Sequence, residues 1–310
     1  MDIKPEKVLI MGCGGVGLPL VNAFSELGLQ LYAQLRSESR AEMLRSKGIA
    51  PIIADLDKAT LPDFPSQDAL IYYFIPPASG GENQNQAGCD VRLERFLKQA
   101  ECARHIVYIS TTGVYGDCHG EWVTEQRPLN PQSASSLRRV AAEQQLYDFH
   151  LRYQVSVTIL RVAAIYGRDR LPVERLRRAD PVLKRSLSHW SNRIHIDDLV
   201  QICLAAGQAQ SFKGQKLTWQ VYNVSDGQPS SMTDYFLQVA QLLGLPQPKE
   251  LTWAEAEQFF SAAMLVYLRE SKRIDNRRML EELKITLRYP SSELGLADSI
   301  ESADILSKKR

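Results

Sequence analysis

The sequence predicts an α/β protein with a Rossmann-type, doubly wound parallel sheet and a smaller, interleaved C-terminal domain. Three observations lead to this prediction. Short apolar runs alternate with amphipathic stretches over residues 1–166, a glycine-rich loop follows the first run, and the alternation stops after residue 166. Strands that alternate with helices form βαβ units, and these build parallel sheets covered by helices on both faces.

The expected strands are of ordinary strand length and rich in β-branched or aromatic residues. They lie at 7–11, 29–35, 49–54, 69–75, 105–110 and 155–162. Helical patterns occupy 18–27 and 89–103, where apolar residues recur on one face. A late strand at 220–225 is expected to return to the main sheet, and the chain from there to Arg310 is expected to be mostly helical with a charged tail.

Composition excludes several classes of protein. Thirty-seven basic against 36 acidic residues leave a net charge of +1, so we expect no nucleic-acid or membrane partner. The five cysteines show no Cys-x-x-Cys spacing and the histidines form no pair, which argues against disulfides and a metal site. With neither a membrane span nor an apolar leader, the chain is expected to be cytoplasmic, a monomer or homodimer.

The loop after the first expected strand has the spacing Gly-x-Gly-x-x-Gly. It reads Gly12-Cys13-Gly14-Gly15-Val16-Gly17 and opens a helical pattern. In this context Gly12 permits a tight turn, Gly14 lets backbone amides approach a pyrophosphate, and Gly17 allows close helix–strand packing. The loop therefore predicts dinucleotide binding by residues 1–166, with 167–310 as a smaller substrate or lid region. A glycine turn without a ligand is the alternative.

The choice of cofactor is predicted from the ends of the second and third strands. Where an NAD-binding protein usually carries an acid, this chain has Arg36 and Ser37, which suit the 2′-phosphate of NADP. NAD stays open, because a solvated arginine is the alternative interpretation of Arg36. Asp55 and Leu56 lie where an adenine amino group would be bound, although Asp55 is also typical of a turn.

Further motifs carry a family resemblance. They read Ser110-Thr111-Thr112-Gly113-Val114-Tyr115-Gly116-Asp117, Leu160-Arg161, Ile165-Tyr166-Gly167, Asn192-Arg193-Ile194-His195-Ile196-Asp197-Asp198 and Tyr222-Asn223-Val224-Ser225-Asp226. In this order they resemble the extended short-chain dehydrogenases/reductases, the NAD-dependent epimerase/dehydratase group. Because the glycine loop departs from that group's usual spacing, the chain is most similar to its atypical, YeeZ-like members.

The resemblance implies a Tyr-x-x-x-Lys pair that exchanges a proton and holds the cofactor ribose, and a hydroxyl residue that steadies the substrate oxygen. Thr111 matches the hydroxyl residue. The pair is absent, because the register puts Ser135 where tyrosine belongs and Arg139 where lysine belongs. Serine lacks the tunable acidity of a phenol. Tyr115 is a candidate substitute acid, although packing is the stronger interpretation.

Other family positions give smaller expectations. Ser191 stands where nucleotide-sugar enzymes often have an arginine that holds a diphosphate. The basic run 168–193 is interpreted as a solvated loop. The alternative is that this run compensates for the missing arginine. His195 is expected to be structural, and Cys13 to pack as a small apolar residue. Two functions follow: an NAD(P)-dependent oxidoreductase or epimerase acting on a small carbonyl or sugar-type substrate, or a non-catalytic NADP-binding sensor or regulatory protein.

Overall fold

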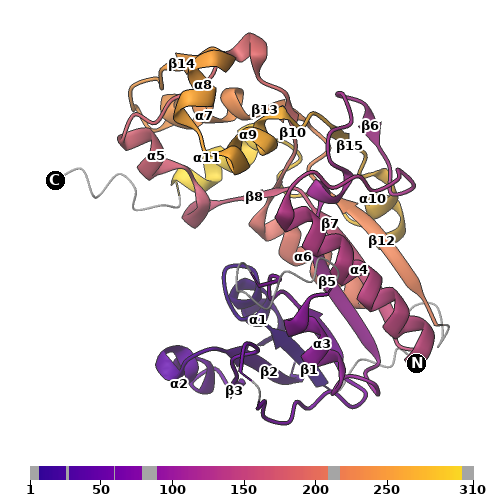
Figure 1. The fold of residues 1–310 in the computed structure, drawn as a ribbon. Coiled ribbons are helices and arrows are strands. Elements are labelled where there is room, and N and C mark those ends of the chain that lie inside the picture. Colours follow the sequence, from indigo (N-terminus) through magenta and orange to yellow (C-terminus); the bar gives the residue numbers. More distant parts are fainter. Residues whose placement is uncertain (1–6, 26–27, 59, 79–88, 209–216, 302–310) are drawn as a thin grey trace.

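The computed structural model describes residues 7–25, 28–58, 60–78, 89–208 and 217–301. Its centre is a seven-stranded, all-parallel sheet in the order β12-β7-β5-β4-β1-β2-β3 (Figure 1). The strands are β1 (Lys7–Met11), β2 (Gln30–Leu35), β3 (Ala50–Ile53), β4 (Leu70–Tyr73), β5 (His105–Thr111), β7 (Ser156–Val162) and β12 (Trp219–Val224). The predicted Rossmann-type fold is confirmed.

The strand order reverses at β1, which lies between β2 and β4. In open parallel sheets, ligands bind outside the carboxyl ends of the strands at this switch point. The loop after β1 opens helix α1 (Gly17–Ser25) at that edge. The fold thus places the glycine loop at the expected ligand site.

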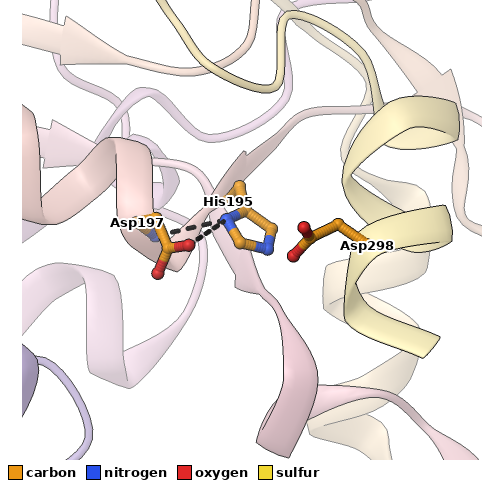
Figure 2. Close-up of side chains that lie close together, drawn as sticks. All are labelled: His195, Asp197 and Asp298. Atoms are coloured by element: carbon orange, nitrogen blue, oxygen red, sulfur yellow. Dashed lines mark hydrogen bonds and ion pairs between the residues drawn. The ribbon is translucent and has the colours of Figure 1, made fainter. Parts of the chain in front are cut away.

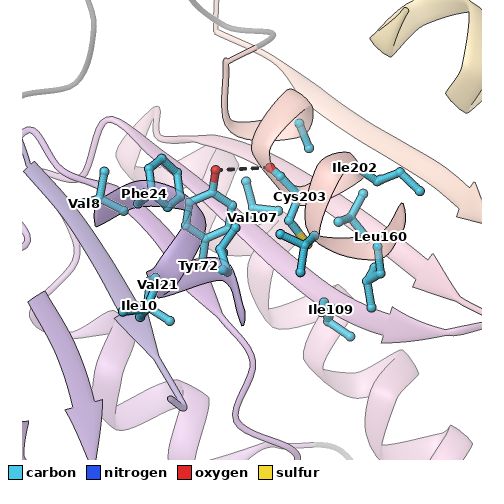
Figure 3. Packing of buried hydrophobic residues seen from close by; sticks show 14 of the residues in the cluster. Val8, Ile10, Val21, Phe24, Tyr72, Val107, Ile109, Leu160, Ile202 and Cys203 are labelled. Carbon is cyan, nitrogen blue, oxygen red and sulfur yellow. Dashed lines mark hydrogen bonds between the residues drawn. The ribbon is translucent and has the colours of Figure 1, made fainter. Parts of the chain in front are cut away.

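Helices cover both faces of the sheet, as the apolar runs require. One apolar cluster packs α1 and α6 (Ile196–Gln208) against the sheet, and the other packs α3 (Val91–Leu97) and α4 (Ala134–Tyr153) on the opposite face. In the first cluster the buried Tyr72 contacts the Phe24 ring and donates its hydroxyl hydrogen to the Cys203 carbonyl at 3.1 Å (Figure 3). This bond satisfies a phenol in an otherwise apolar layer.

The C-terminal half adds a second, mostly helical part, drawn in the upper region of Figure 1. Its helices are α5 (Val173–Arg177), α7 (Met232–Leu242), α8 (Trp253–Phe259), α9 (Ala262–Arg269) and α11 (Ser292–Glu301). Two short strand pairs lie within this half, β9 (Val182–Leu183) with β14 (Glu250–Leu251) and β10 (Trp190–Ser191) with β13 (Ser230–Ser231). Two others connect it to earlier strands, β8 (Ala164–Tyr166) with β11 (Arg193–His195) and β6 (Trp122–Val123) with β15 (Arg273–Ile274). Three late elements, α6, β12 and α10 (Arg277–Leu283), pack in the main sheet layer, so the two parts interleave.

Two helical segments differ from the expectation. The helix predicted over 89–103 is confined to α3, because Gln99 and Ala100 form tighter i→i−3 bonds and the Gln99 side chain accepts the Phe64 N–H at 2.9 Å. Helix α1 is described as far as Ser25, and residues 26–27 and 302–310 of the predicted helix and charged tail lie outside the described residues. The remaining helix, α2 (Ala41–Arg45), follows β2. None of the helices in the described part of the chain has the length and hydrophobicity to span a membrane.

Candidate functional site

A cavity of about 610 Å³ lies outside the carboxyl ends of β1, β2 and β4. Its wall contains all of the predicted cofactor residues except Gly17, together with the predicted Arg139. These are Gly12, Cys13, Gly14, Gly15, Val16, Arg36, Ser37, Asp55, Leu56 and Arg139. Residues from four separate stretches of sequence therefore meet around one space large enough for a cofactor.

The three motif glycines have different surroundings. Gly12 has a φ of +92°, which favours glycine. A Cβ placed on Gly14 would meet no atom within 4 Å, whereas one placed on Gly17 would lie 2.3 Å from the Gly12 carbonyl oxygen. Gly14 therefore faces open space while Gly17 is packed against the loop itself, which explains why Gly17 lies outside the cavity wall.

Gln34 holds this loop in place, and sequence reasoning missed it. Its side-chain oxygen accepts the Gly12 N–H at 3.0 Å, its side-chain amide donates to the Ala54 carbonyl, and its backbone carbonyl accepts the Cys13 N–H at 3.0 Å. Gln34 is 2% exposed. An amide in a buried strand is a signal that could have identified it, because buried polar groups need partners.

The cavity is strongly basic. Its wall carries the side chains of Arg36, Arg40, Arg92, Arg139 and Arg170 but one carboxylate, that of Asp55. Arg92 pairs with Asp57 and donates to the Pro76 carbonyl at 3.0 Å, and the Arg92 hydrogen bond holds the pKa of Asp57 below its usual range. Arg139 donates to the Ile109 carbonyl at 2.7 Å and the Tyr108 hydroxyl at 2.9 Å. This charge excess suits a polyanionic ligand.

Two of the predicted cofactor residues, Asp55 and Cys13, also have a structural role. Asp55 lines the cavity, and its carboxylate also accepts the Asp57 N–H at 3.1 Å, as a turn aspartate does. Cys13 is buried in the sheet core, where burial raises the pKa of its thiol to about 11. Its thiol is therefore protonated and packs as an apolar group.

A second cavity, of about 290 Å³, contains Thr111 and Ser135. Other hydroxyl residues share its wall, namely Thr112, Ser133, Ser136, Ser188, Ser191 and Tyr267. The two cavities meet the same elements: Arg139 and Ser135 are one helical turn apart on α4, and Ile109 and Thr111 are both on β5. The structure thus places the predicted ribose-holding residue and the predicted hydroxyl residues at neighbouring positions on shared elements.

Tyr115 lines neither cavity. It is 1% exposed, donates to Asn223 Oδ1 at 2.7 Å and accepts a hydrogen bond from Arg161 at 2.9 Å. Burial raises the pKa of Tyr115 to about 12. Arg161 in turn forms a buried ion pair with Glu143 at 2.8 Å. This arrangement favours the packing interpretation of Tyr115, and its role as a substitute acid stays a prediction.

The second cavity also holds an ion pair that the sequence did not indicate. Lys272, 7% exposed, pairs with Glu270 and donates to the Gly116 carbonyl at 2.7 Å. Ser191 donates to the Ser230 carbonyl at 3.0 Å. The interpretation of the basic run as solvated is wrong for Arg193, because α7 covers its strand, β11. Arg193 is 4% exposed, lies over the Tyr235 ring and donates to the Ser230 hydroxyl.

His195 lies beside two carboxylates, Asp197 and Asp298, with ligand-type atoms within 4.8 Å of one another (Figure 2). Its Nδ1 accepts the Asp197 N–H at the start of α6, and its Nε2 lies 3.2 Å from the Ser299 hydroxyl. Burial lowers the pKa of His195, so the ring is neutral and both nitrogens are used. The cluster caps a helix, and these bonds leave the imidazole no lone pair for a metal.

The sheet and the glycine loop at its switch point define the class of dinucleotide-binding α/β proteins. A sequence model of the NAD dependent epimerase/dehydratase family matches residues 8–225, most of the chain, and the protein belongs to that family. The chain is 26% identical to Protein YeeZ of Escherichia coli (strain K12) over 291 residues, covering 92% of this chain and 97% of YeeZ. The predicted family resemblance is confirmed.

Solved structures share the fold of this chain. A conserved protein of unknown function from Silicibacter pomeroyi DSS is 28% identical, with a TM-score of 0.77, covering 96% of this chain and 99% of that one. MoeE5 in complex with UDP-glucose and NAD is 20% identical, with a TM-score of 0.71, covering 95% and 97% of the two chains. At that identity MoeE5 shows a common fold alone.

Proposed function

We propose that this protein is an NADP-dependent oxidoreductase or epimerase that acts on a small polar carbonyl or sugar-type substrate. The observation that carries the proposal is the pair of cavities on shared elements, one with the predicted cofactor residues and one with Thr111 and Ser135. A near-neutral chain supports a small-molecule substrate rather than nucleic acid or membrane. The proposed state is a monomer or homodimer.

The residues of the first cavity fit a nicotinamide dinucleotide. Its pyrophosphate would be held by the backbone of residues 12–16 and the start of α1, and a 2′-phosphate by Arg36 and Ser37. Asp55 suits the adenine amino group, and Arg139 the second ribose. The excess of arginines favours NADP, because NADP carries one phosphate more than NAD. When bound, the nicotinamide supplies or accepts a hydride.

In this proposal Thr111 and Ser135 orient the substrate oxygen in the second cavity, and both are poor proton donors. Ser135 is exposed and its hydroxyl lies 2.9 Å from that of Ser133, while Thr111 Oγ accepts the Gly113 N–H at 3.1 Å. Neither hydroxyl has the tunable acidity of a phenol. General acid–base catalysis contributes about 10²–10⁴-fold, so turnover that relies on these two hydroxyls alone should be slow by that factor.

A second candidate is a non-catalytic NADP-binding sensor or regulatory protein. It is favoured by Tyr115, the candidate substitute acid, whose hydroxyl is committed to Asn223 and Arg161. This candidate keeps the cofactor cavity and assigns no chemistry to the second one.

Turnover assays separate the two candidates. Hydride exchange with NADPH is measured on a panel of small aldehydes, ketones and sugar nucleotides for the wild type and for Ser135→Tyr combined with Arg139→Lys. The enzyme proposal expects weak wild-type turnover that rises in the double variant. Cofactor binding with no turnover by either protein contradicts it and leaves the sensor. Robust wild-type turnover that is lost in a folded Tyr115→Phe variant shows instead that Tyr115 is the acid.

A further inference from the structure

Gly15 is a glycine that the Gly-x-Gly-x-x-Gly motif does not require, and the structure explains it. A Cβ placed on Gly15 would lie 2.1 Å from Arg170 Nη2 and 3.1 Å from Arg170 Cζ. The Arg170 guanidinium therefore rests directly on the backbone of the glycine loop. Both residues line the first cavity, so this contact forms part of its wall.

Arg170 is anchored to the C-terminal part of the chain. It ends a short 3₁₀ turn, Arg168–Arg170, that follows β8, and its N–H donates to the Gly167 carbonyl at 2.9 Å. Strand β8 pairs in parallel with β11. The guanidinium thus reaches the glycine loop from an element that follows the sheet strands of the first half.

The charge of Arg170 has no counterpart in the described part of the chain. Its guanidinium makes no hydrogen bond or ion pair with the described residues, whereas Arg92 and Arg139 in the same cavity are paired or hydrogen bonded. The loop beneath it opens α1, whose N-terminus carries partial positive charge. Arg170 is exposed, so water solvates its charge, and the guanidinium beside this helix N-terminus is available to an anion that enters the cavity.

We propose that Arg170 clamps the pyrophosphate of the dinucleotide against the glycine loop, so that the C-terminal part of the chain completes the cofactor site. This inference rests on the proposed function. A guanidinium offers two parallel N–H donors to phosphate oxygens, and Gly15 gives the fork room to lie flat on the loop. The missing side chain at position 15 is then a requirement of the clamp rather than of the turn.

Calorimetric titrations with three ligands test the clamp. NADP and ADP-ribose contain the pyrophosphate, and adenosine 2′-monophosphate lacks it. Arg170→Ala removes the clamp. Gly15→Ala adds a methyl group that displaces the Arg170 guanidinium, at a backbone angle that alanine tolerates. Arg168→Ala is the matched control, because Arg168 lies in the same turn, is exposed and is outside the cavity wall.

The clamp predicts that Arg170→Ala and Gly15→Ala each weaken NADP and ADP-ribose about 10- to 100-fold, as expected for one charge-assisted contact. Adenosine 2′-monophosphate should stay within about twofold, and Arg168→Ala should match the wild type. Unchanged ADP-ribose affinity in Arg170→Ala, or an equal loss for adenosine 2′-monophosphate, overturns the clamp while leaving the proposed function. A wild type that binds neither NADP nor ADP-ribose overturns both.

Discussion

Gly14 and Gly17 are three residues apart in one motif, yet the structure predicts opposite consequences for replacing them. A Cβ on Gly14 points into the cavity and touches nothing within 4 Å, whereas a Cβ on Gly17 lies 2.3 Å from the backbone oxygen of Gly12. Gly14→Ala should therefore leave stability unchanged or raise it by about 0.4–1 kcal/mol, through reduced freedom of the unfolded chain. Gly17→Ala should lower stability by about 1–3 kcal/mol, the usual consequence of overpacking.

Although Gly14→Ala should not lower stability, it should weaken the binding of NADP. The added methyl group in Gly14→Ala holds a pyrophosphate away from the loop amides, and losing a charge-assisted bond costs about 1.5–3 kcal/mol, or roughly 10- to 150-fold in Kd. Urea unfolding gives the stability of each variant, and calorimetry with NADP gives its affinity. The reasoning is refuted if Gly14→Ala binds NADP as the wild type does, or if Gly14→Ala is the less stable of the two variants.

Three further predictions concern charge. Arg36→Asp should reverse a preference for NADP over NAD, because it removes a contact worth about 1.5–3 kcal/mol from the 2′-phosphate; an unchanged affinity ratio makes Arg36 an ordinary surface residue. Arg161→Met leaves the buried Glu143 carboxylate unpaired and should lower the free energy of unfolding in urea by about 3–5 kcal/mol. Arg127→Met, from an exposed pair, should change it little, and equal losses contradict this. Burial raises the pKa of Asp226 from 3.8 to about 7, so its contribution to stability is present below pH 3.8 and is lost as pH rises through 7. Between pH 4 and 8 the stability of Asp226→Asn should therefore rise relative to that of the wild type, by on the order of a few kcal/mol. A stability difference that does not vary with pH refutes this prediction.

Local patterns predicted the sheet and the glycine loop, because a buried parallel strand and a turn at a helix start each have a signature in a few adjacent residues. Long-range contacts had no such signature. The Tyr115 hydroxyl meets Asn223 across 108 residues, and Lys272 meets Gly116 across 156. The short helix α3 was over-extended for a related reason, since the Gln99 side chain that helps to end it bonds to Phe64, 35 residues earlier.

The same limit applies within the candidate site. The predicted residues of the first cavity come from strand ends, whose positions follow from the topology. Gln34 carried a readable signal as a polar residue in an apolar strand. Arg170 did not, because nothing in a basic run distinguishes the one arginine that folds back over the glycine loop. That contact depends on how the C-terminal part packs against the sheet.

The central claim is that the basic cavity at the switch point holds NADP, with its nicotinamide end toward Thr111 and Ser135. A crystal structure of the wild-type protein grown with NADP tests this most directly. The account predicts the pyrophosphate over Gly14 and the 2′-phosphate beside Arg36. A dinucleotide bound elsewhere, with the space above Gly14 left empty, would contradict it.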